Sequence, residues 1–172
     1  AMKASSRVAS LLAFLRKNRA DFPMDSAVTK GWSLHPQLAQ DTVPLGDLPL
    51  ARVLLAKDAN YPWLILVPRL PGLVELIDLE ENAQVQLLGE IAAAARALKS
   101  VTRCDKLNIA ALGNQVPQLH VHVIARRRSD AAWPKPVWGV KPPLAYNDSQ
   151  QASLLGVLRQ SLKASGLSDM DH

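Results

Sequence analysis

The chain has 172 residues, of which 48% are hydrophobic and 20% charged, and its 20 Lys and Arg outnumber 15 Asp and Glu to give a net charge of +5. This length suits one domain with a substantial core, and the composition excludes a disordered chain. No apolar run approaches the roughly 20 residues of a membrane-spanning helix, so we expect no membrane partner.

The moderate positive charge fits an anionic small molecule, nucleic acid or ordinary solubility. Cys104 is the single cysteine, which excludes an intramolecular disulfide and a cysteine-based zinc site. A reducing, cytoplasmic location is the natural expectation.

The N-terminal segment, residues 3–20, lacks acidic side chains and carries several Arg and Lys, a composition found in organellar transit peptides. Its apolar residues nevertheless fall at helical spacing, which favours an amphipathic helix that packs on the domain. These residues are Val8, Leu11, Leu12 and Leu15.

The next stretch, residues 21–50, is rich in proline and polar side chains and predicts irregular structure with short extended pieces, of which residues 32–35 are one candidate. Two strands are expected after it, at residues 52–56 and 63–67, with a loop at 57–62 between them. The second strand is almost entirely apolar, which indicates burial on both of its faces.

A long helix is expected after these strands. Asp78 is followed three residues later by Glu81, which is the spacing of a capping box, so the helix should begin there and continue to about Lys99. The residues expected on its buried face are Val85, Leu88, Ile91, Ala95 and Leu98.

Two further strands are expected beyond the helix, at residues 107–112 and 118–125, with a turn at Gly113 and Asn114 between them. The element order therefore begins strand, strand, helix, strand, strand. With a last helix after it, this order predicts an α+β fold with a mostly antiparallel sheet.

That last helix is expected near the C-terminus, with Asp148 or Ser149 as its N-cap and Gly166 as its stop. Its inward side chains should be four leucines at helical spacing. They are Leu154, Leu155, Leu158 and Leu162.

The most informative stretch is Pro117–Ile124, where polar and apolar side chains alternate. In a strand, this pattern places Gln118, His120 and His122 on one face and the apolar side chains on the other. Two of the four histidines of the chain would therefore stand side by side.

Such a histidine pair has three interpretations. A metal site needs a third and a fourth ligand, and no acidic residue lies within seven positions of the pair, although His35 could approach it. A purely structural pair of hydrogen-bonded histidines is the second interpretation. In the third, an imidazole attacks an electrophile or moves a proton, because imidazole is half-ionised near neutral pH.

The segment Gln118–Ile124 resembles the signature of the histidine-triad (HIT) superfamily, in which three histidines alternate with apolar residues. The preceding residues, 107–116, resemble the strand and turn that lead into the triad. Residues 54–58 and 63–69 resemble the nucleotide-binding strand pair of that superfamily. The resemblance covers roughly residues 50–140 and rests on three blocks in the same order, with the long helix between them.

The resemblance implies a catalytic histidine. His120 takes the middle position of the triad, where the histidine of this superfamily attacks the α-phosphorus of a nucleotide and forms a covalent nucleotidyl-histidine. His122 takes the last position, where it would hydrogen-bond the phosphate or the leaving group. Gln118 replaces the first histidine. Because an amide cannot titrate, Gln118 could orient His120 or donate to phosphate but could not relay a proton.

The resemblance also implies nucleotide-binding residues. Asp58, next to Lys57, matches the ribose-binding acid of the superfamily, with a turn-forming role as the alternative. Asn114 and Gln115 fall where family members place groups that donate to phosphate oxygens, and simple turn chemistry is again the alternative. Trp133, in the proline-rich loop after the triad, offers a flat indole that could stack on a base.

Three further features remain open between function and packing. Trp63 stands where many hydrolases of the superfamily carry an additional histidine. Trp138 flanks the same loop as Trp133, and packing within the fold is the main alternative for each tryptophan. Arg126–Arg128 follows the triad directly and could attract polyphosphate, but a solvated strand end is the favoured interpretation.

The predicted fold is therefore α+β and HIT-like, with a mostly antiparallel sheet, a long helix between strand pairs and helical extensions at both ends. We divide the chain into an N-terminal helical extension at residues 1–30, a HIT-like catalytic domain at 31–145, and a C-terminal helix and tail at 146–172.

The predicted function is that of an enzyme, a nucleotide phosphohydrolase or nucleotidyl transferase that acts on a dinucleoside polyphosphate or a nucleoside phosphoramidate. The resemblance implies a homodimer and no cofactor or metal, although a divalent cation can accompany a polyphosphate substrate. No nucleic-acid partner is expected, because no strand combines aromatic and basic side chains. The alternatives are a catalytically impaired nucleotide-binding protein, which Gln118 favours, and a metal-binding protein that uses His120 and His122.

Overall fold

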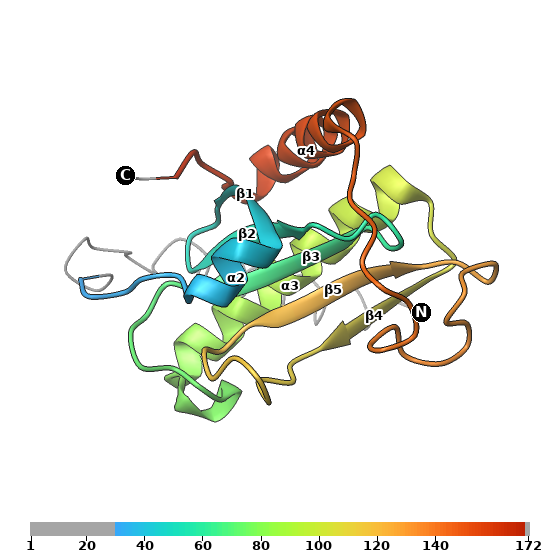
Figure 1. Ribbon diagram of the computed structural model, residues 1–172. Helices are drawn as coiled ribbons and strands as arrows, with labels where there is room; N and C mark the ends of the chain where they lie inside the picture. The colour runs from blue at the N-terminus through green and yellow to red at the C-terminus, as the bar shows by residue number, and fades with distance from the viewer. Residues whose placement is uncertain (1–29, 171–172) are drawn as a thin grey trace, which may run out of the picture.

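The structure, a computed structural model, describes residues 30–170 and is built on one antiparallel sheet (Figure 1). Its five strands lie in the order β1-β2-β3-β5-β4. They are β1 (Thr42–Asp47), β2 (Ala51–Ala56), β3 (Trp63–Pro68), β4 (Lys106–Ala110) and β5 (Val121–Arg126). The predicted α+β fold with a mostly antiparallel sheet is confirmed, whereas the helix predicted within residues 3–20 lies outside the described residues.

Helical elements cover both faces of this sheet (Figure 1). They are α2 (Pro36–Asp41), η1 (Leu76–Asp78), α3 (Glu81–Thr102), α4 (Asp148–Leu162) and η2 (Lys163–Ser165). Helices α3 and α4 share the main hydrophobic core with one face of the sheet. The short α2 lies on the opposite face, where its Leu38 packs with Ile65 and Val67 of β3.

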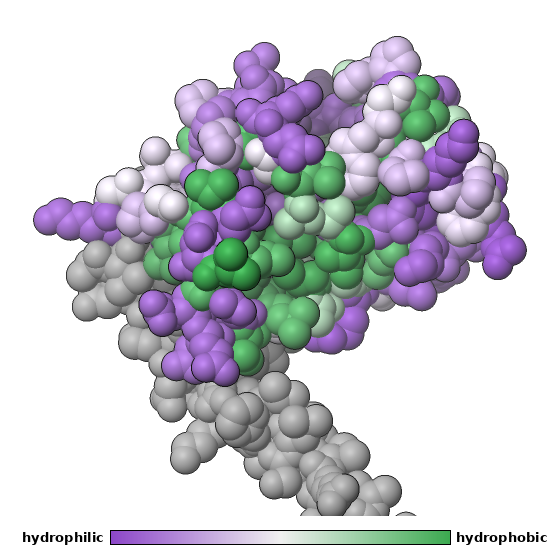
Figure 2. Space-filling view, turned by 90° about the horizontal axis from the view of Figure 1, so that it is seen from below, coloured by the Kyte–Doolittle hydropathy of each residue, from purple (hydrophilic) through white to green (hydrophobic). Residues whose placement is uncertain are grey.

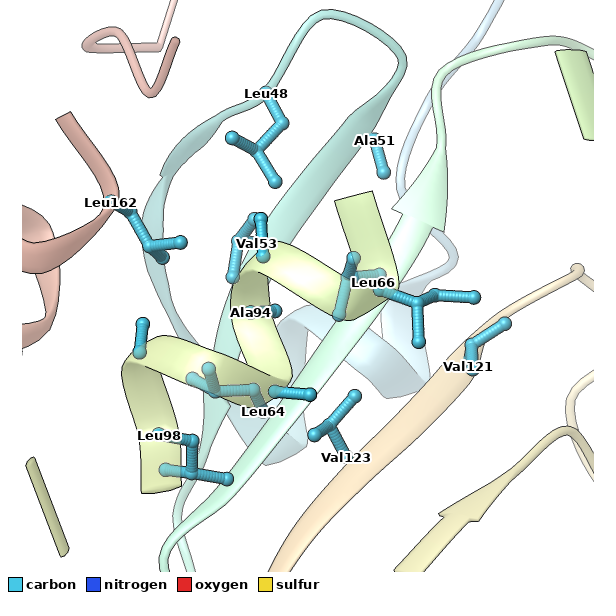
Figure 3. Packing of buried hydrophobic residues seen from close by; sticks show 14 of the residues in the cluster. Leu48, Ala51, Val53, Leu64, Leu66, Ala94, Leu98, Val121, Val123 and Leu162 are labelled. Atoms are coloured by element: carbon cyan, nitrogen blue, oxygen red, sulfur yellow. The ribbon is translucent and has the colours of Figure 1, made fainter. Parts of the chain in front are cut away.

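The main core lies between the sheet and α3. Leu64 of β3 and Val123 of β5 are fully buried there together with Ala94 and Leu98 of the helix (Figure 3). The alanines of α3 let the helix approach the branched side chains of the strands closely. Because the alternate residues of β3 are buried against α2, the predicted burial of this strand on both faces is confirmed.

Both long helices are capped differently from the prediction. The capping box at the start of α3 is wrong, because the Asp78 carboxylate accepts hydrogen bonds from the Val74 and Glu75 amides within the preceding turn. Helix α4 starts at the expected place, but its N-cap is Asn147, whose side-chain oxygen accepts from the Gln150 amide. Its last three predicted inward leucines are buried.

The buried face of α3 is rotated from the predicted one. Val85 and Leu88 are 43% and 67% exposed, whereas the other three predicted positions are buried. Glu90 belongs to the buried face and is 3% exposed, because its carboxylate accepts from the backbone amides of Leu50 and Ala51. A buried acid with such distant partners cannot be recognised from hydrophobic periodicity.

Strand β1 lies in the stretch predicted to be irregular. It contains Pro44, which an edge strand tolerates because one side of the strand makes no ladder hydrogen bonds. The register shifts between Pro44 and Gly46, and a Cβ on Gly46 would lie 2.6 Å from the Ser168 carbonyl oxygen. Proline and glycine in one short strand explain why the sequence pattern did not reveal it.

Strand β5 is shorter than predicted, because it begins at Val121 and leaves Gln118 and His120 in the preceding loop. The side chains still alternate as predicted. Leu119 and Val121 belong to the main core, whereas His120 lines a pocket on the other side.

Arg126, at the end of β5, corrects a further prediction. It was expected at a solvated strand end, yet it is 1% exposed. Its guanidinium donates to the Asp130 carboxylate, the Asn108 side chain and the Lys135 carbonyl. Arg126 therefore fastens the loop after β5 to the sheet.

Some hydrophobic side chains remain on the surface. Figure 2 shows hydrophobic residues gathered across the middle of the face seen from below, with hydrophilic residues around them. Ile77, next to α3, is 85% exposed. Within residues 30–170, no helix combines the length and the hydrophobicity needed to cross a membrane.

Candidate functional site

A pocket with a volume of about 660 Å³ lies on the sheet face covered by α2. This volume is within the range of small-molecule sites. The structure brings six of the predicted site residues to its lining: Lys57, Asp58, Asn114, Gln115, His120 and His122. Gln118 and Trp133, which were also predicted to belong to the site, are outside the lining.

His120 is 7% exposed, and its ring orientation is set by the backbone. Its Nδ1 lies 2.6 Å from the carbonyl oxygen of Gln118. Since a carbonyl only accepts hydrogen bonds, Nδ1 must carry the ring proton, and Nε2 of the neutral ring keeps a free lone pair. This is the protonation pattern that an imidazole needs in order to act as a nucleophile.

His122 has the opposite pattern. Its Nδ1 accepts a hydrogen bond from the indole Nε1–H of Trp63 at 3.0 Å, so the proton of the neutral ring is on Nε2. Burial, and secondarily the nearby His120, lowers the pKa of His122 from 6.5 to about 4. His122 is therefore neutral near pH 7 and offers an N–H donor.

Aromatic rings surround this histidine pair. The ring centroids of His120 and His122 are 4.8 Å apart, and Trp63 and Trp138 contact the His122 ring edge-to-face at 5.2 and 5.6 Å. Trp138 lines the pocket, whereas Trp133 is the tryptophan predicted to stack on a base. Trp133 instead lies 5.9 Å from the Arg126 guanidinium. Only the fold distinguishes these two tryptophans of one loop.

Asp58 lies at the pocket and also takes part in the turn considered as its alternative role. It lines the pocket, and its Oδ1 accepts from both nitrogens of Asn60 and from the Leu144 amide. These bonds form the turn before β3 and draw the loop around Leu144 to the pocket. Neighbouring Lys57 donates from Nζ to the Gln40 carbonyl at 2.7 Å.

Asn114 and Gln115 lie in the exposed loop between β4 and β5 and line the pocket. In the described part of the chain, neither side-chain amide is engaged in a hydrogen bond. Both can therefore turn toward a ligand without breaking an internal contact.

Gln118 faces away from this lining. Its side-chain amide is hydrogen-bonded to the backbone of Ser33 and His35 at the N-terminal end of the described chain. This contact cannot be predicted from local sequence patterns, because its partners are more than 80 positions away.

A metal site needs three or more ligand side chains close together. Among residues 30–170, no three His, Cys, Asp or Glu side chains come together as a metal site. His35, considered as a third ligand, caps α2 through its Nδ1, which accepts from the Gln37 amide at 3.2 Å.

The five-stranded antiparallel sheet and the two adjacent imidazoles over a small-molecule pocket define a protein of the HIT-like class. A family model for the HIT domain matches residues 37–129. The chain therefore belongs to the HIT family, which is part of a superfamily of nucleotide-binding hydrolases and transferases.

Solved structures of similar proteins agree with this assignment. A histidine triad protein from Bradyrhizobium japonicum is 62% identical, with a TM-score of 0.75 over 76% of this chain and 97% of that one. Histidine triad proteins from Marinobacter aquaeolei and Sinorhizobium meliloti are 45% and 38% identical. Both have a TM-score of 0.76 over 78% of this chain and 98% and 99% of theirs. A search of curated proteins gives no match.

Proposed function

We propose that this chain is a nucleotide hydrolase or nucleotidyl transferase that acts through a covalent nucleotidyl-histidine at His120. Its substrate is a nucleoside phosphate, either a dinucleoside polyphosphate or a nucleoside phosphoramidate. The observation that carries the proposal is the hydrogen bond from His120 Nδ1 to the Gln118 carbonyl, because it leaves Nε2 as a free nucleophile beside a pocket.

In the first step, Nε2 of His120 attacks the α-phosphorus. A phosphorus–nitrogen bond forms and the bond between the α-phosphorus and the leaving group breaks. The ring becomes cationic in this intermediate, and the Nδ1–H bond to the Gln118 carbonyl stabilises the positive charge. In the second step, the oxygen of water or of another acceptor forms a bond to the same phosphorus and the phosphorus–nitrogen bond breaks. The proton of the acceptor passes to solvent, and His120 is released as the neutral ring.

The neighbouring groups can stabilise the negative charge that develops on the phosphate oxygens during the attack. His122 is neutral and can donate from Nε2 to a phosphate or leaving-group oxygen. We assign the side-chain amides of Asn114 and Gln115, which line the pocket, as donors to phosphate oxygens, and Lys57 as a source of positive charge. Asp58 is assigned to the ribose hydroxyls. Gln118 is not assigned a chemical step, and Trp133 is not assigned to the base.

The oligomeric state and the cellular location are proposed by analogy with the family. We assign a homodimer, consistent with the exposed Val85 and Leu88 on α3, and a cytoplasmic location, in which the lone thiol of Cys104 stays reduced. The reaction is assigned no cofactor beyond a divalent cation that accompanies a polyphosphate.

The test is His120→Ala, assayed on adenosine polyphosphates and adenosine phosphoramidate. Turnover should fall by about 10⁴-fold or more, as expected on removal of a nucleophile. Intact-mass spectrometry of rapidly quenched wild-type protein should show a nucleotidyl adduct that the variant lacks. The variant should still bind adenosine monophosphate by calorimetry, which shows that the pocket is intact.

Turnover that survives in His120→Ala would reject the assignment of the nucleophile. Tight nucleotide binding by the wild-type protein without turnover on any member of the panel would instead identify a binding protein. Stoichiometric metal in the purified protein would favour the metal-binding alternative.

A further inference from the structure

Gln118 occupies the first triad position, yet its side chain bonds to backbone outside the pocket. Its Oε1 accepts from the His35 amide at 2.9 Å, and its Nε2 donates to the Ser33 carbonyl at 2.9 Å. Both hydrogen-bonding groups of the carboxamide are therefore used on one segment, Trp32–His35.

These contacts reproduce the bonds that a neighbouring parallel strand would make. In a parallel sheet, the N–H of one residue donates to one residue of the adjacent strand, and its C=O accepts from another residue two positions further along that strand. Ser33 and His35 have this spacing, and a carboxamide carries a donor and an acceptor on one planar group. Histidine cannot replace it, because its two ring nitrogens point in diverging directions.

The segment bonded to Gln118 leads directly into α2. His35 is the N-cap of this helix, and the Trp32 ring lies 5.1 Å from the Arg52 guanidinium on β2. Helix α2 has six residues, which is too short for a helix to be stable alone. Its position must therefore be set by contacts with the rest of the protein.

Helix α2 in turn forms one wall of the pocket. Its residues Leu38, Gln40 and Asp41 line the pocket, and Figure 1 shows the helix in front of the sheet. The Asp41 carbonyl accepts from the Lys57 amide at 2.9 Å, so the wall is also joined to the loop that carries Asp58. A displacement of α2 would change the shape of the pocket without moving either histidine.

We infer that Gln118 is a positioning residue: it fixes the Trp32–His35 segment, and through it the α2 wall against which a nucleoside phosphate binds. The inference rests on the proposed function for the identity of the ligand, but its geometric part is independent of that function. It also accounts for glutamine at a triad position, because this side chain is required for two backbone hydrogen bonds and not for proton transfer.

The experiment compares Gln118→Met, which removes both hydrogen bonds, with Gln118→His, which restores the family residue. Gln160→Met, on the exposed side of α4, is the matched control. Amide hydrogen exchange of residues 33–41 is measured without ligand. Binding of adenosine monophosphate is measured by calorimetry, and kcat is measured at saturating substrate.

In both Gln118 variants, the His35 and α2 amides should exchange about tenfold faster or more, and adenosine monophosphate should bind roughly tenfold more weakly, as expected for the loss of two neutral hydrogen bonds. The kcat, measured at saturating substrate, should be unchanged. Gln160→Met should match the wild type throughout.

Unchanged exchange and affinity in both Gln118 variants would overturn the inference, and so would a higher kcat in Gln118→His, which would make the position catalytic. If either variant fails to fold, Gln118→Glu provides the same comparison, because it keeps the acceptor for His35 and loses the donor for Ser33. If the wild-type protein does not bind adenosine monophosphate, the proposed function fails, while the exchange rates still decide the role of Gln118.

Discussion

Replacing Trp63 by phenylalanine should release the ring of His122 from its present tautomer while leaving the site aromatic. In the wild-type protein, the indole N–H of Trp63 donates to Nδ1 of His122 at 3.0 Å. Phenylalanine keeps an apolar ring at this position but has no donor. The Nδ1–H form of His122, which points its only lone pair toward the substrate side, then becomes populated.

The size of the effect follows from two contributions. The pKa of His122 is lowered from 6.5 to about 4 mainly by burial, which the Trp63→Phe variant would preserve because its new ring is equally apolar. The indole hydrogen bond favours the Nε2–H tautomer of the neutral ring by about 1 kcal/mol, which is a bias of roughly fivefold. Without this bond the two tautomers become about equally populated, so the fraction of rings that offer an N–H donor, and with it kcat at pH 7, should fall by up to about twofold.

The assay is a pH titration of the imidazole nitrogens by long-range proton–nitrogen NMR, with kcat measured on the same samples. Wild-type His122 should show an unprotonated Nδ1 from pH 5 to 8, and Trp63→Phe should show a mixture of tautomers. Trp138→Phe is the matched control, because Trp138 contacts the same ring edge-to-face but makes no hydrogen bond to it within the described residues. A wild-type ring that titrates near 6.5, or a Trp63→Phe spectrum identical to the wild type, would refute the reasoning.

Two more predictions concern stability and assembly. In the unfolded chain His122 binds a proton below pH 6.5, whereas in the folded protein its pKa is lowered to about 4. The free energy of unfolding should therefore fall as the pH drops from 6.5 to about 4. The loss from His122 alone should be about 2 kcal/mol between pH 7 and pH 5. Urea denaturation should show a correspondingly shallower pH dependence in His122→Phe, and equal dependence in both proteins would contradict the assignment. Leu88→Glu, which puts a charge on the exposed apolar side of α3, should convert the proposed dimer to a monomer in sedimentation equilibrium. A wild-type monomer, or a variant that remains dimeric, would exclude this surface as the interface.

Features that depend on neighbouring residues could be predicted from the sequence. The apolar run of β3 indicates a strand buried on both faces, and the alternation through Leu119 and Val121 places the histidines opposite the core. The inward leucines of α4 can be predicted for the same reason, since helical spacing is a local property.

Features that depend on distant partners could not be predicted. Glu90 is buried because two amides some 40 residues away satisfy its carboxylate, and this burial rotates the face of α3. From the sequence, Arg126 is indistinguishable from the two arginines that follow it. In the structure it is buried, because it donates to Asp130 and to the Lys135 carbonyl in the loop that follows β5. Trp138 rather than Trp133 reaches the pocket because the loop after β5 is fastened in this way.

The two histidines of the site show what a sequence motif can and cannot determine. His120 and His122 are chemically identical and lie on the same side of the chain, so the motif alone assigns them no different protonation states. The hydrogen-bond partners of the two Nδ1 atoms do assign different protonation states, since a carbonyl can only accept and an indole N–H can only donate. One ring therefore presents a lone pair and its neighbour presents a proton, 4.8 Å apart between centroids. An attack on phosphorus needs both, a nucleophile for the phosphorus atom and a donor for the oxygen that gains charge. Because Trp63 cannot titrate in this role as a histidine could, the division between the two rings does not depend on the protonation of a third residue.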